Sequence, residues 1–304
     1  MIIDAHVHLA PSVSGCTKGG FVKTGAYGII EYASGERVRL MPPSFTATES
    51  APEPLLEYME WQGVDRAVIM QSQLYGEWNA HVKAIERRYP DKFTAVGTYD
   101  PYVKNSEKTL MKMVAEDGFR TVKLECSADW GLSGLHTALD YADDNFRPLW
   151  RLANERELTV VIDTGEMGTH GHQMETLGSL AAQYRKMRLV IAHLGFPPEN
   201  RDDESLWHKT VAIGRLDNVW FDIANILGLV NEEYPFPLAQ HYLEYAHRQL
   251  GARKLIFGSD YPGVLTRCTY RQALQYVQKH CRFISPADLQ AIMGGNALSV
   301  YQIK

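Results

Sequence analysis

The sequence begins Met1-Ile2-Ile3-Asp4-Ala5-His6-Val7-His8, a short apolar run that ends in two histidines. Further short runs rich in β-branched residues follow along the chain, and longer amphipathic segments separate them. This alternation is typical of strands that are buried on both faces and connected through helices. It predicts strands at residues 2–8, 65–71, 93–99, 121–125, 158–163, 188–193, 219–223 and 254–259.

The amphipathic segments predict helices near residues 53–62, 79–89, 106–117, 145–157, 173–186, 203–216, 236–250 and 269–281. A final helix is expected to begin at Ser285-Pro286-Ala287-Asp288, with serine as the N-cap, proline at the first position and an acid in the first turn. A repeated strand–helix unit of this length indicates an α/β protein with a (β/α)₈ TIM barrel. We expect one domain over residues 1–304.

Residues 11–51 interrupt this rhythm, because they separate the first strand from the first helix by far more than the usual few residues. The segment is rich in glycine and proline and leaves the carboxyl end of the first strand, where barrels carry their active sites. We therefore predict an insertion that forms a lid or a small hairpin. A surface decoration without a role in the site is the alternative.

Composition excludes several classes of function. The chain has 304 residues, a formal net charge of −5 and no block of like charges, which argues against a nucleic-acid partner. Its apolar runs are far shorter than the roughly 18 residues of a membrane span. The amino terminus lacks a secretory signal pattern, and the four cysteines are far apart without a C-x-x-C pair. We expect a cytoplasmic protein that acts on a small molecule.

The first strand is expected to present His6 and His8 on one side of the sheet, because successive side chains of a strand point to opposite faces. Two imidazole nitrogens on one face form half of a site for a divalent ion. At the open end of a barrel, such a site keeps a coordination position for water or substrate.

Other strand ends also carry ionisable side chains, which packing alone explains poorly because burying them without partners costs several kcal/mol. These residues are Lys123, Glu125, Asp163, Glu166, His193 and Asp260. We predict that they converge with His6 and His8 on one rim of the barrel. The alternatives are a buried ion pair between Lys123 and Asp163, and a core histidine at position 193 that donates to a backbone carbonyl.

Five short motifs in order resemble the amidohydrolase superfamily: H-x-H at 6–8, Gly-Phe-Arg-Thr-Val-Lys-Leu at 118–124, Ile-Ala-His-Leu-Gly at 191–195, Gly-Ser-Asp-Tyr-Pro at 258–262 and Gly-Asn-Ala at 295–297. The branch indicated is the amidohydrolase-related group, with aminocarboxymuconate semialdehyde decarboxylase and the resorcylate-type decarboxylases. The resemblance implies a distorted barrel and one zinc or manganese ion. It makes His6 and His8 metal ligands, His193 a catalytic histidine or ligand, and Asp260 a ligand that moves protons.

The fifth strand departs from the family pattern, because Asp163 stands in Val-Val-Ile-Asp-Thr-Gly where the branch has histidine. We expect Asp163 to replace that histidine as a metal ligand, and a carboxylate ligand would shift the preference toward harder ions such as manganese or magnesium. Alternatively, His170 or His172 in the following loop completes the metal shell. In a third reading the ion is absent, and His6, His8 and His193 work as acid, base and oxyanion stabiliser in a metal-free lactonase.

The reaction we expect first is metal-dependent hydrolysis of a lactone or amide of a small cyclic or aromatic carboxylated substrate. A bound ion would lower the pKa of water, Asp260 would accept the proton, and His193 would polarise the carbonyl. Decarboxylation of an aromatic or muconate-type acid uses the same groups and is the main alternative, ahead of a barrel that only binds. Retention of H-x-H together with His193 and Asp260 argues against a barrel without chemistry.

Substrate contacts are expected from loops that follow the strands. Trp78 and Tyr261 would suit a ring-shaped substrate, and Arg267 would pair with a carboxylate. The predicted substrate-binding residues are Trp78, Lys123, Glu125, Glu166, His170, His172, Tyr261 and Arg267. The oligomeric state stays open, with a homodimer as the expectation from other barrels of this kind.

Overall fold

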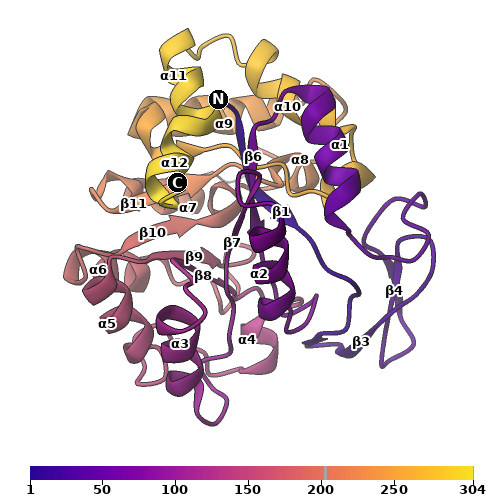
Figure 1. The fold of residues 1–304 in the computed structure, drawn as a ribbon. Helices are drawn as coiled ribbons and strands as arrows, with labels where there is room; N and C mark the ends of the chain where they lie inside the picture. Colours follow the sequence, from indigo (N-terminus) through magenta and orange to yellow (C-terminus); the bar gives the residue numbers. More distant parts are fainter. Residues whose placement is uncertain (202–203, 304) are drawn as a thin grey trace.

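A computed structural model describes residues 1–201 and 204–303, and its barrel strands form two parallel sheets (Figure 1). One sheet contains β1 (Ile3–His8), β6 (Arg66–Met70) and β7 (Phe93–Ala95). The other contains β8 (Thr121–Glu125), β9 (Thr159–Asp163), β10 (Arg188–Ile191), β11 (Val219–Asp222) and β12 (Leu255–Ile256). Each predicted strand is confirmed, although several are shorter than expected.

Backbone hydrogen bonds connect the two sheets at both edges. Ala5 N donates to Phe257 O over 3.0 Å beside β12, and Lys123 N donates to Gly97 O over 2.8 Å between β7 and β8. Inward-facing residues of both sheets, such as Val68 and Val190, form one buried inner cluster. The arrangement confirms the predicted TIM barrel.

The first strand contains an irregularity that aims its histidines. Its pairing with β6 shifts register between Asp4 and Val7. Ala5 belongs to the inner cluster, whereas Val7 belongs to the outer layer that packs against the helices. A bulge adds a residue to one strand and re-aims the side chains beyond it. Here it lets His6 and His8 reach the barrel interior while Asp4 points elsewhere.

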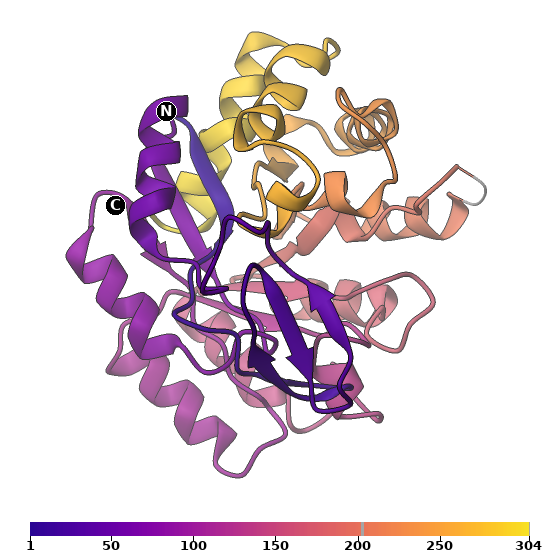
Figure 2. The same ribbon diagram turned by 90° about the vertical axis from the view of Figure 1, so that its right-hand side faces the viewer.

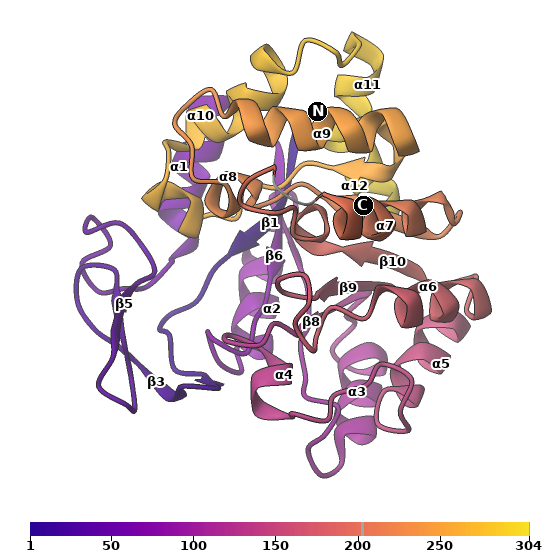
Figure 3. The same ribbon diagram turned by 180° about the vertical axis from the view of Figure 1, so that it is seen from behind.

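The helices cover the outside of the barrel, as the view from behind shows (Figure 3). They pack on a large apolar layer between strands and helices. Their bounds are α1 (Pro52–Gln62), α2 (Asn79–Arg88), α3 (Ser106–Ala115), α4 (Leu132–Leu135), α5 (Arg147–Arg156), α6 (Met174–Gln183), α7 (Ser205–Ala212), α8 (Ile226–Leu229), α9 (Pro237–Leu250), α10 (Tyr270–Gln275), α11 (Pro286–Gln290) and α12 (Asn296–Val300).

Most predicted helices are confirmed within a few residues. The helix predicted at 203–216 begins at Ser205 as α7 and ends in a 3₁₀ turn over Ile213–Arg215, while its predicted first residue lies outside the described residues. The helix predicted at 269–281 is α10 followed by a π-helical turn. Ser285 caps α11 as expected, because its hydroxyl accepts a hydrogen bond from Asp288 N. No helix within the described residues is both long and apolar enough to pass through a bilayer.

The insertion after β1 folds as an antiparallel sheet rather than a single hairpin (Figure 2). Its strands are β2 (Cys16–Thr17), β3 (Gly20–Thr24), β4 (Ile29–Tyr32) and β5 (Arg37–Arg39), in that spatial order. Ala10 and Ser50 exchange backbone hydrogen bonds of 3.0 and 2.9 Å, which close the base of the insertion. A small apolar cluster that includes Ile30 and Leu74 attaches this sheet to the barrel.

Candidate active site

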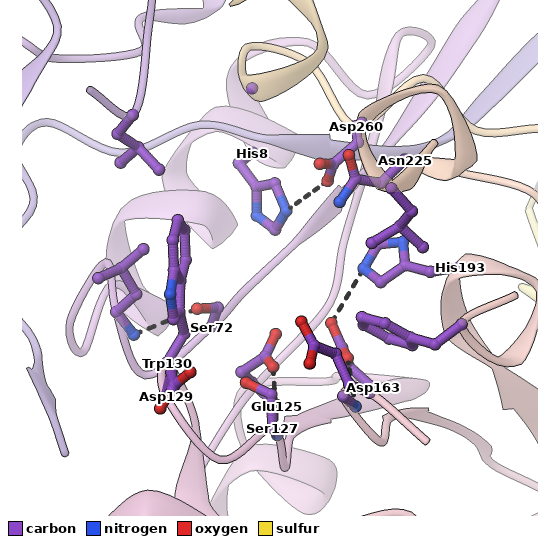
Figure 4. Close-up of a pocket in the computed structure, with 18 of the residues that line it drawn as sticks. His8, Ser72, Glu125, Ser127, Asp129, Trp130, Asp163, His193, Asn225 and Asp260 are labelled. Carbon is purple, nitrogen blue, oxygen red and sulfur yellow. Dashed lines mark hydrogen bonds and ion pairs between the residues drawn. The ribbon is translucent and has the colours of Figure 1, made fainter. Parts of the chain in front are cut away.

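A cavity of about 360 Å³ opens at the carboxyl ends of the barrel strands (Figure 4). The predicted site residues that line it are His8, Lys123, Glu125, Asp163, Glu166, His193, Asp260 and Arg267. His6 is fully buried and contacts Lys123 and Asp260. Side chains separated by more than 250 positions of chain therefore meet at one place, as the strand-end pattern predicted.

His6 is held as a neutral imidazole. Its Nδ1 lies 3.0 Å from Asp222 Oδ2, and its Nε2 lies 3.2 Å from Lys123 Nζ. Burial, aided by the charge of Lys123, lowers the pKa of His6 to about 4. The Nδ1–H therefore donates to Asp222, which leaves a lone pair on Nε2 directed at Lys123 and the neighbouring Asp260.

Asp222 at the end of β11 is a site residue that the sequence reasoning missed. Its Oδ1 accepts from the backbone N–H of His193 at 2.9 Å and of Ala224 at 3.1 Å, while Oδ2 binds His6. Burial opposes its charge, but His6 and His193 outweigh burial and hold the pKa of Asp222 below its usual range. An acid ending an otherwise apolar strand was the available signal.

His193 is positioned as a cation. Its Nε2 lies 2.9 Å from Asp163 Oδ2, and its Nδ1 lies 3.1 Å from Ala224 O, so both ring nitrogens face acceptors. Burial opposes protonation, but the charge and hydrogen bond of Asp163 raise the pKa of His193 to about 10. Its backbone has a φ of +56° just after β10, in the left-handed region. The backbone contact expected for a core histidine is present, and the ring also lines the cavity.

Lys123 lies between the histidines and the acids. Its Nζ is 3.9 Å from both Glu125 Oε2 and Asp163 Oδ2, and only 1% of its side chain is exposed. The predicted ion pair with Asp163 is thus present. The ammonium also faces the cavity, so pairing does not remove it from the site.

Glu125 and Asp163 form a close carboxyl pair with unequal protonation. Burial and the neighbouring charge of Asp163 raise the pKa of Glu125 to about 8. The pKa of Asp163 is held well below its usual range, because His193 and Lys123 outweigh the effect of burial. Glu125 therefore carries a proton at neutral pH and is a hydrogen-bond donor in the cavity.

Asp260 is the ionised acid opposite these groups. Its Oδ1 lies 3.1 Å from His8 Nε2 and 3.7 Å from His6 Nε2. Burial raises the pKa of this carboxyl, yet the His8 hydrogen bond and the nearby imidazoles lower it to about 2. The backbone of Asp260 has a φ of +67°, and its N–H donates to His6 O over 2.9 Å. This hydrogen bond fixes the position of Asp260 relative to β1.

The donor atoms of His6, His8 and Asp260 fit a divalent ion. One ligand atom from each lies within 4.8 Å of the others, and the contact of His6 with Asp222 is the outer-shell support common for a metal-bound imidazole. Two nitrogens and one carboxylate with an open side are typical of catalytic zinc. Lys123 Nζ competes for the same His6 lone pair. Asp163 lies outside this group and pairs with His193 instead.

Four predicted substrate-binding residues are not among the described residues that line the cavity. Trp78 Nε1 donates to Tyr75 O, and Tyr261 is fully buried among other aromatic rings. His170 is exposed, and His172 Nε2 lies 3.1 Å from Thr210 Oγ1. Sequence indicates that these residues follow strands, but not the direction of their side chains.

The sequence reasoning also missed several lining residues. Arg39 and Leu40 reach the cavity from the insertion, and Ser72 and Asn225 reach it from loops after β6 and β11. Tyr75, by contrast, is one of the strand-end aromatic residues that the sequence suggested for a ring-shaped substrate; it lines the cavity and stacks on His8 with ring centroids 4.8 Å apart. Nothing in the sequence around Arg39 and Leu40 indicates that they line the cavity, because their position depends on how the insertion folds back over the barrel.

Comparisons with known proteins agree with this geometry. The family model for amidohydrolases matches residues 3–303. The chain is 26% identical to the L-fucono-1,5-lactonase of Burkholderia ambifaria over 264 residues, which cover 83% of this chain and 85% of that protein.

Solved structures share the fold at low identity. An amidohydrolase from Burkholderia multivorans with bound HEPES has a TM-score of 0.77 at 17% identity, covering 100% of both chains. An amidohydrolase from the same species with bound zinc gives 0.74 at 16% identity, again over 100% of both chains. The 5-carboxyvanillate decarboxylase of Sphingomonas paucimobilis gives 0.59 at 14% identity, over 84% of each chain. Because the family model extends across residues 3–303, this chain belongs to the amidohydrolase family and is an enzyme of that family.

Proposed function

We propose that this enzyme hydrolyses the lactone of a small, hydroxylated acid. The observation that carries the proposal is the placement of the Asp260 carboxylate, 3.1 Å from His8, in a cavity that His193 and Lys123 also line. A base and a pair of cations in one cavity match the needs of water attack on a carbonyl. The similarity to an L-fucono-1,5-lactonase supports the same reaction class.

The residues can divide the reaction as follows. Asp260 takes a proton from water as the oxygen of that water attacks the lactone carbonyl. The Lys123 ammonium stabilises the negative charge that develops on the carbonyl oxygen, and His193, whose two N–H groups are held by Asp163 and Ala224, contributes through its positive charge. Asp260 then returns the proton to the ring oxygen when the carbon–oxygen bond breaks. Protonated Glu125 can donate a hydrogen bond to that departing oxygen. The net change is addition of one water to give a hydroxy acid.

His6, His8 and Asp260 would hold one divalent ion, zinc or manganese, in this scheme. When bound, such an ion lowers the pKa of water and polarises a carbonyl. In the metal-free alternative, His6, His8 and His193 would act as acid, base and oxyanion stabiliser, with the Lys123 ammonium 3.2 Å from His6 Nε2.

The charge of the cavity favours a neutral hydroxylated ring over the carboxylated substrate that the sequence reasoning expected. With Glu125 protonated and His193 charged, the lining has four anionic side chains (Asp129, Asp163, Glu166 and Asp260) and four cationic ones (Arg39, Lys123, His193 and Arg267), so it has no excess of positive charge. Substrate anions are usually held by a clear excess of basic side chains. Ser72, Ser127, Thr169 and Asn225 supply hydrogen-bonding groups that suit hydroxyls.

The test is a substrate panel of aldonolactones, aromatic lactones, amides and hydroxybenzoates, with acid release and carbon dioxide followed together. We expect acid release from aldonolactones without carbon dioxide. The variant His170→Gln should give the same product pattern as wild type, because His170 is exposed and does not line the cavity. Carbon dioxide from the hydroxybenzoates with no lactone opening would replace the proposal by the decarboxylase alternative.

A further inference from the structure

A second cavity, of about 480 Å³, lies between the insertion and the loop that follows β8. The insertion contributes Lys18, Gly19, Tyr32, Ser34, Glu36 and Val38. The barrel contributes Asp129 and Trp130. None of these residues has a place in the reaction described above.

The second cavity adjoins the reaction cavity. Asp129 and Trp130 line both of them, and Figure 4 shows the two side chains together at one border of the reaction cavity. On the insertion side, Val38 lines the second cavity while the next residues, Arg39 and Leu40, line the first. The two cavities therefore meet at Asp129 and Trp130.

The lining of the second cavity suits a sugar ring. Trp130, which is 39% exposed, supplies aromatic surface, and Tyr32, which is 7% exposed, forms part of the wall. Gly19 leaves room for the tyrosine, since a Cβ there would come within 2.8 Å of the Tyr32 ring. Lys18, Ser34, Glu36 and Asp129 supply donors and acceptors for hydroxyls.

The charge of the lining restricts which sugar ring can bind in the second cavity. Glu36 and Asp129 outnumber Lys18 by one, so the lining carries a formal charge of 1 − 2 = −1 and does not favour an anion. Lys18 and Asp129 form an ion pair of 3.1 Å with side chains 64% and 72% exposed. Such exposed pairs contribute little stability, so both groups are available to ligand hydroxyls.

We propose that this cavity is a second binding subsite, which takes a neutral sugar ring attached to the lactone that is opened beside Asp260. The preferred substrate is then the lactone of a two-ring aldonic acid. This inference rests on the proposed lactonase function for its catalytic half, whereas binding in the second cavity stands on its own geometry.

The test compares glucono-lactone with the lactones of 4-O- and 6-O-galactosyl gluconic acid. Wild type is expected to show a kcat/KM about tenfold higher for at least one two-ring lactone, mainly through KM, because one or two good contacts contribute about that factor. Glu36→Ala and the cavity-filling Ser34→Trp should remove this advantage and leave the one-ring lactone within about twofold of wild type. Glu31→Ala is the matched control, because Glu31 is exposed on the same small sheet outside both cavities.

Equal kcat/KM values for one-ring and two-ring lactones in wild type would overturn the inference. So would an equal effect of Ser34→Trp on both kinds of lactone. Calorimetric titration with the unoxidised disaccharides, lactose and melibiose, separates this inference from the proposed function. If no lactone is opened, disaccharide binding that Ser34→Trp abolishes still supports the subsite, whereas absence of binding to wild type refutes it.

Discussion

At the scale of single residues, the site depends on how each titratable group is paired. Asp222 directs His6, Asp163 keeps His193 charged, and His8 contacts Asp260. Each pair joins side chains from different strands or from the segments that directly follow them. A change at one partner is therefore expected to alter the protonation or direction of the other.

The clearest example is Asp222→Asn. It removes the charge that accepts the Nδ1–H of His6 and leaves the backbone N–H of His193 with a weaker acceptor. Loss of such a supporting carboxylate usually lowers activity or metal affinity 10- to 100-fold, so we expect about that loss in kcat/KM. Steady-state kinetics and the melting temperature should be measured together. Full activity would show that Asp222 does not orient His6.

Lys123→Met tests the competition between the ammonium and a metal ion. Removing a cation 3.2 Å from His6 Nε2 should raise zinc affinity by at least about tenfold, the equivalent of 1.4 kcal/mol. Zinc titration by calorimetry measures this directly. Lys112→Met on α3 is the control, because Lys112 pairs with Asp117 far from these histidines in the sequence. Unchanged affinity would mean that Lys123 and the ion do not share a position.

At this scale, the sequence pointed to most of the ionisable residues of the site, but it missed Asp222 and assigned two aromatic residues wrongly to the cavity. His6, His8, His193 and Asp260 were found because ionisable groups at the ends of apolar strands have few structural explanations. Asp222 obeys the same rule and was overlooked. Trp78 and Tyr261 were assigned to the substrate although they pack inward, since side-chain direction in a loop depends on tertiary contacts.

At the scale of elements, β1 and the segment after β12 together position His6, His8 and Asp260, the candidate metal ligands. Asp4, on β1, accepts hydrogen bonds from Ser259 N at 2.8 Å, Ser259 Oγ at 2.6 Å and Tyr270 OH at 2.9 Å. These bonds hold the segment that carries Asp260 against the first strand. The strand order was predictable from periodicity, whereas the bulge in β1 was not, because it is a matter of register.

Close approach of these two segments explains a glycine in the Gly-Ser-Asp-Tyr-Pro motif. A Cβ at Gly258 would lie 2.6 Å from the Cβ of His6 and 3.1 Å from that of Ala224. We expect Gly258→Ala to cost about 1–3 kcal/mol of folding free energy and to lower activity by displacing His6. Denaturant unfolding measures the first effect. Gly178→Ala in α6 is the control, since its nearest neighbour is at an ordinary 3.4 Å; equal effects at both positions would contradict this explanation.

The strands of the insertion could not be predicted from the sequence. Its length and its position after β1 were evident, but the antiparallel order of β2 to β5 was not. Short strands with tight turns depend on contacts with the rest of the fold, here the cluster around Leu74. The contribution of Arg39 and Leu40 to the reaction cavity follows from that docking.

At the scale of the whole molecule, activity and stability should both depend on pH through Glu125. Its pKa is raised to about 8 from an ordinary value of 4.5, so the folded state keeps a proton that the unfolded state has lost between those values. Folding stability from this group therefore falls as pH rises across that window. The hydrogen bond that Glu125 donates in the cavity is lost only as the pH rises through its folded-state pKa of about 8.

We therefore expect kcat/KM to decline as the pH rises through about 8. Glu125→Gln should retain most of the activity at neutral pH and lack this alkaline decline, because an amide stays a donor. Profiles of kcat/KM against pH for the two proteins provide the measurement. If kcat/KM declined in the same way at alkaline pH in wild type and Glu125→Gln, the decline would belong to another group.

The central claim is that Asp260 activates a water molecule for attack on a lactone carbonyl. The most direct measurement is lactone opening in ¹⁸O-water near neutral pH, with the label in the product acid followed by mass spectrometry for wild type and Asp260→Asn. We predict one labelled oxygen in the new carboxylate, formed by wild type at least about 10²-fold faster than by the variant, the smallest factor usual for a general base. Equal rates for the two proteins, or label absent from the carboxylate, would contradict the claim.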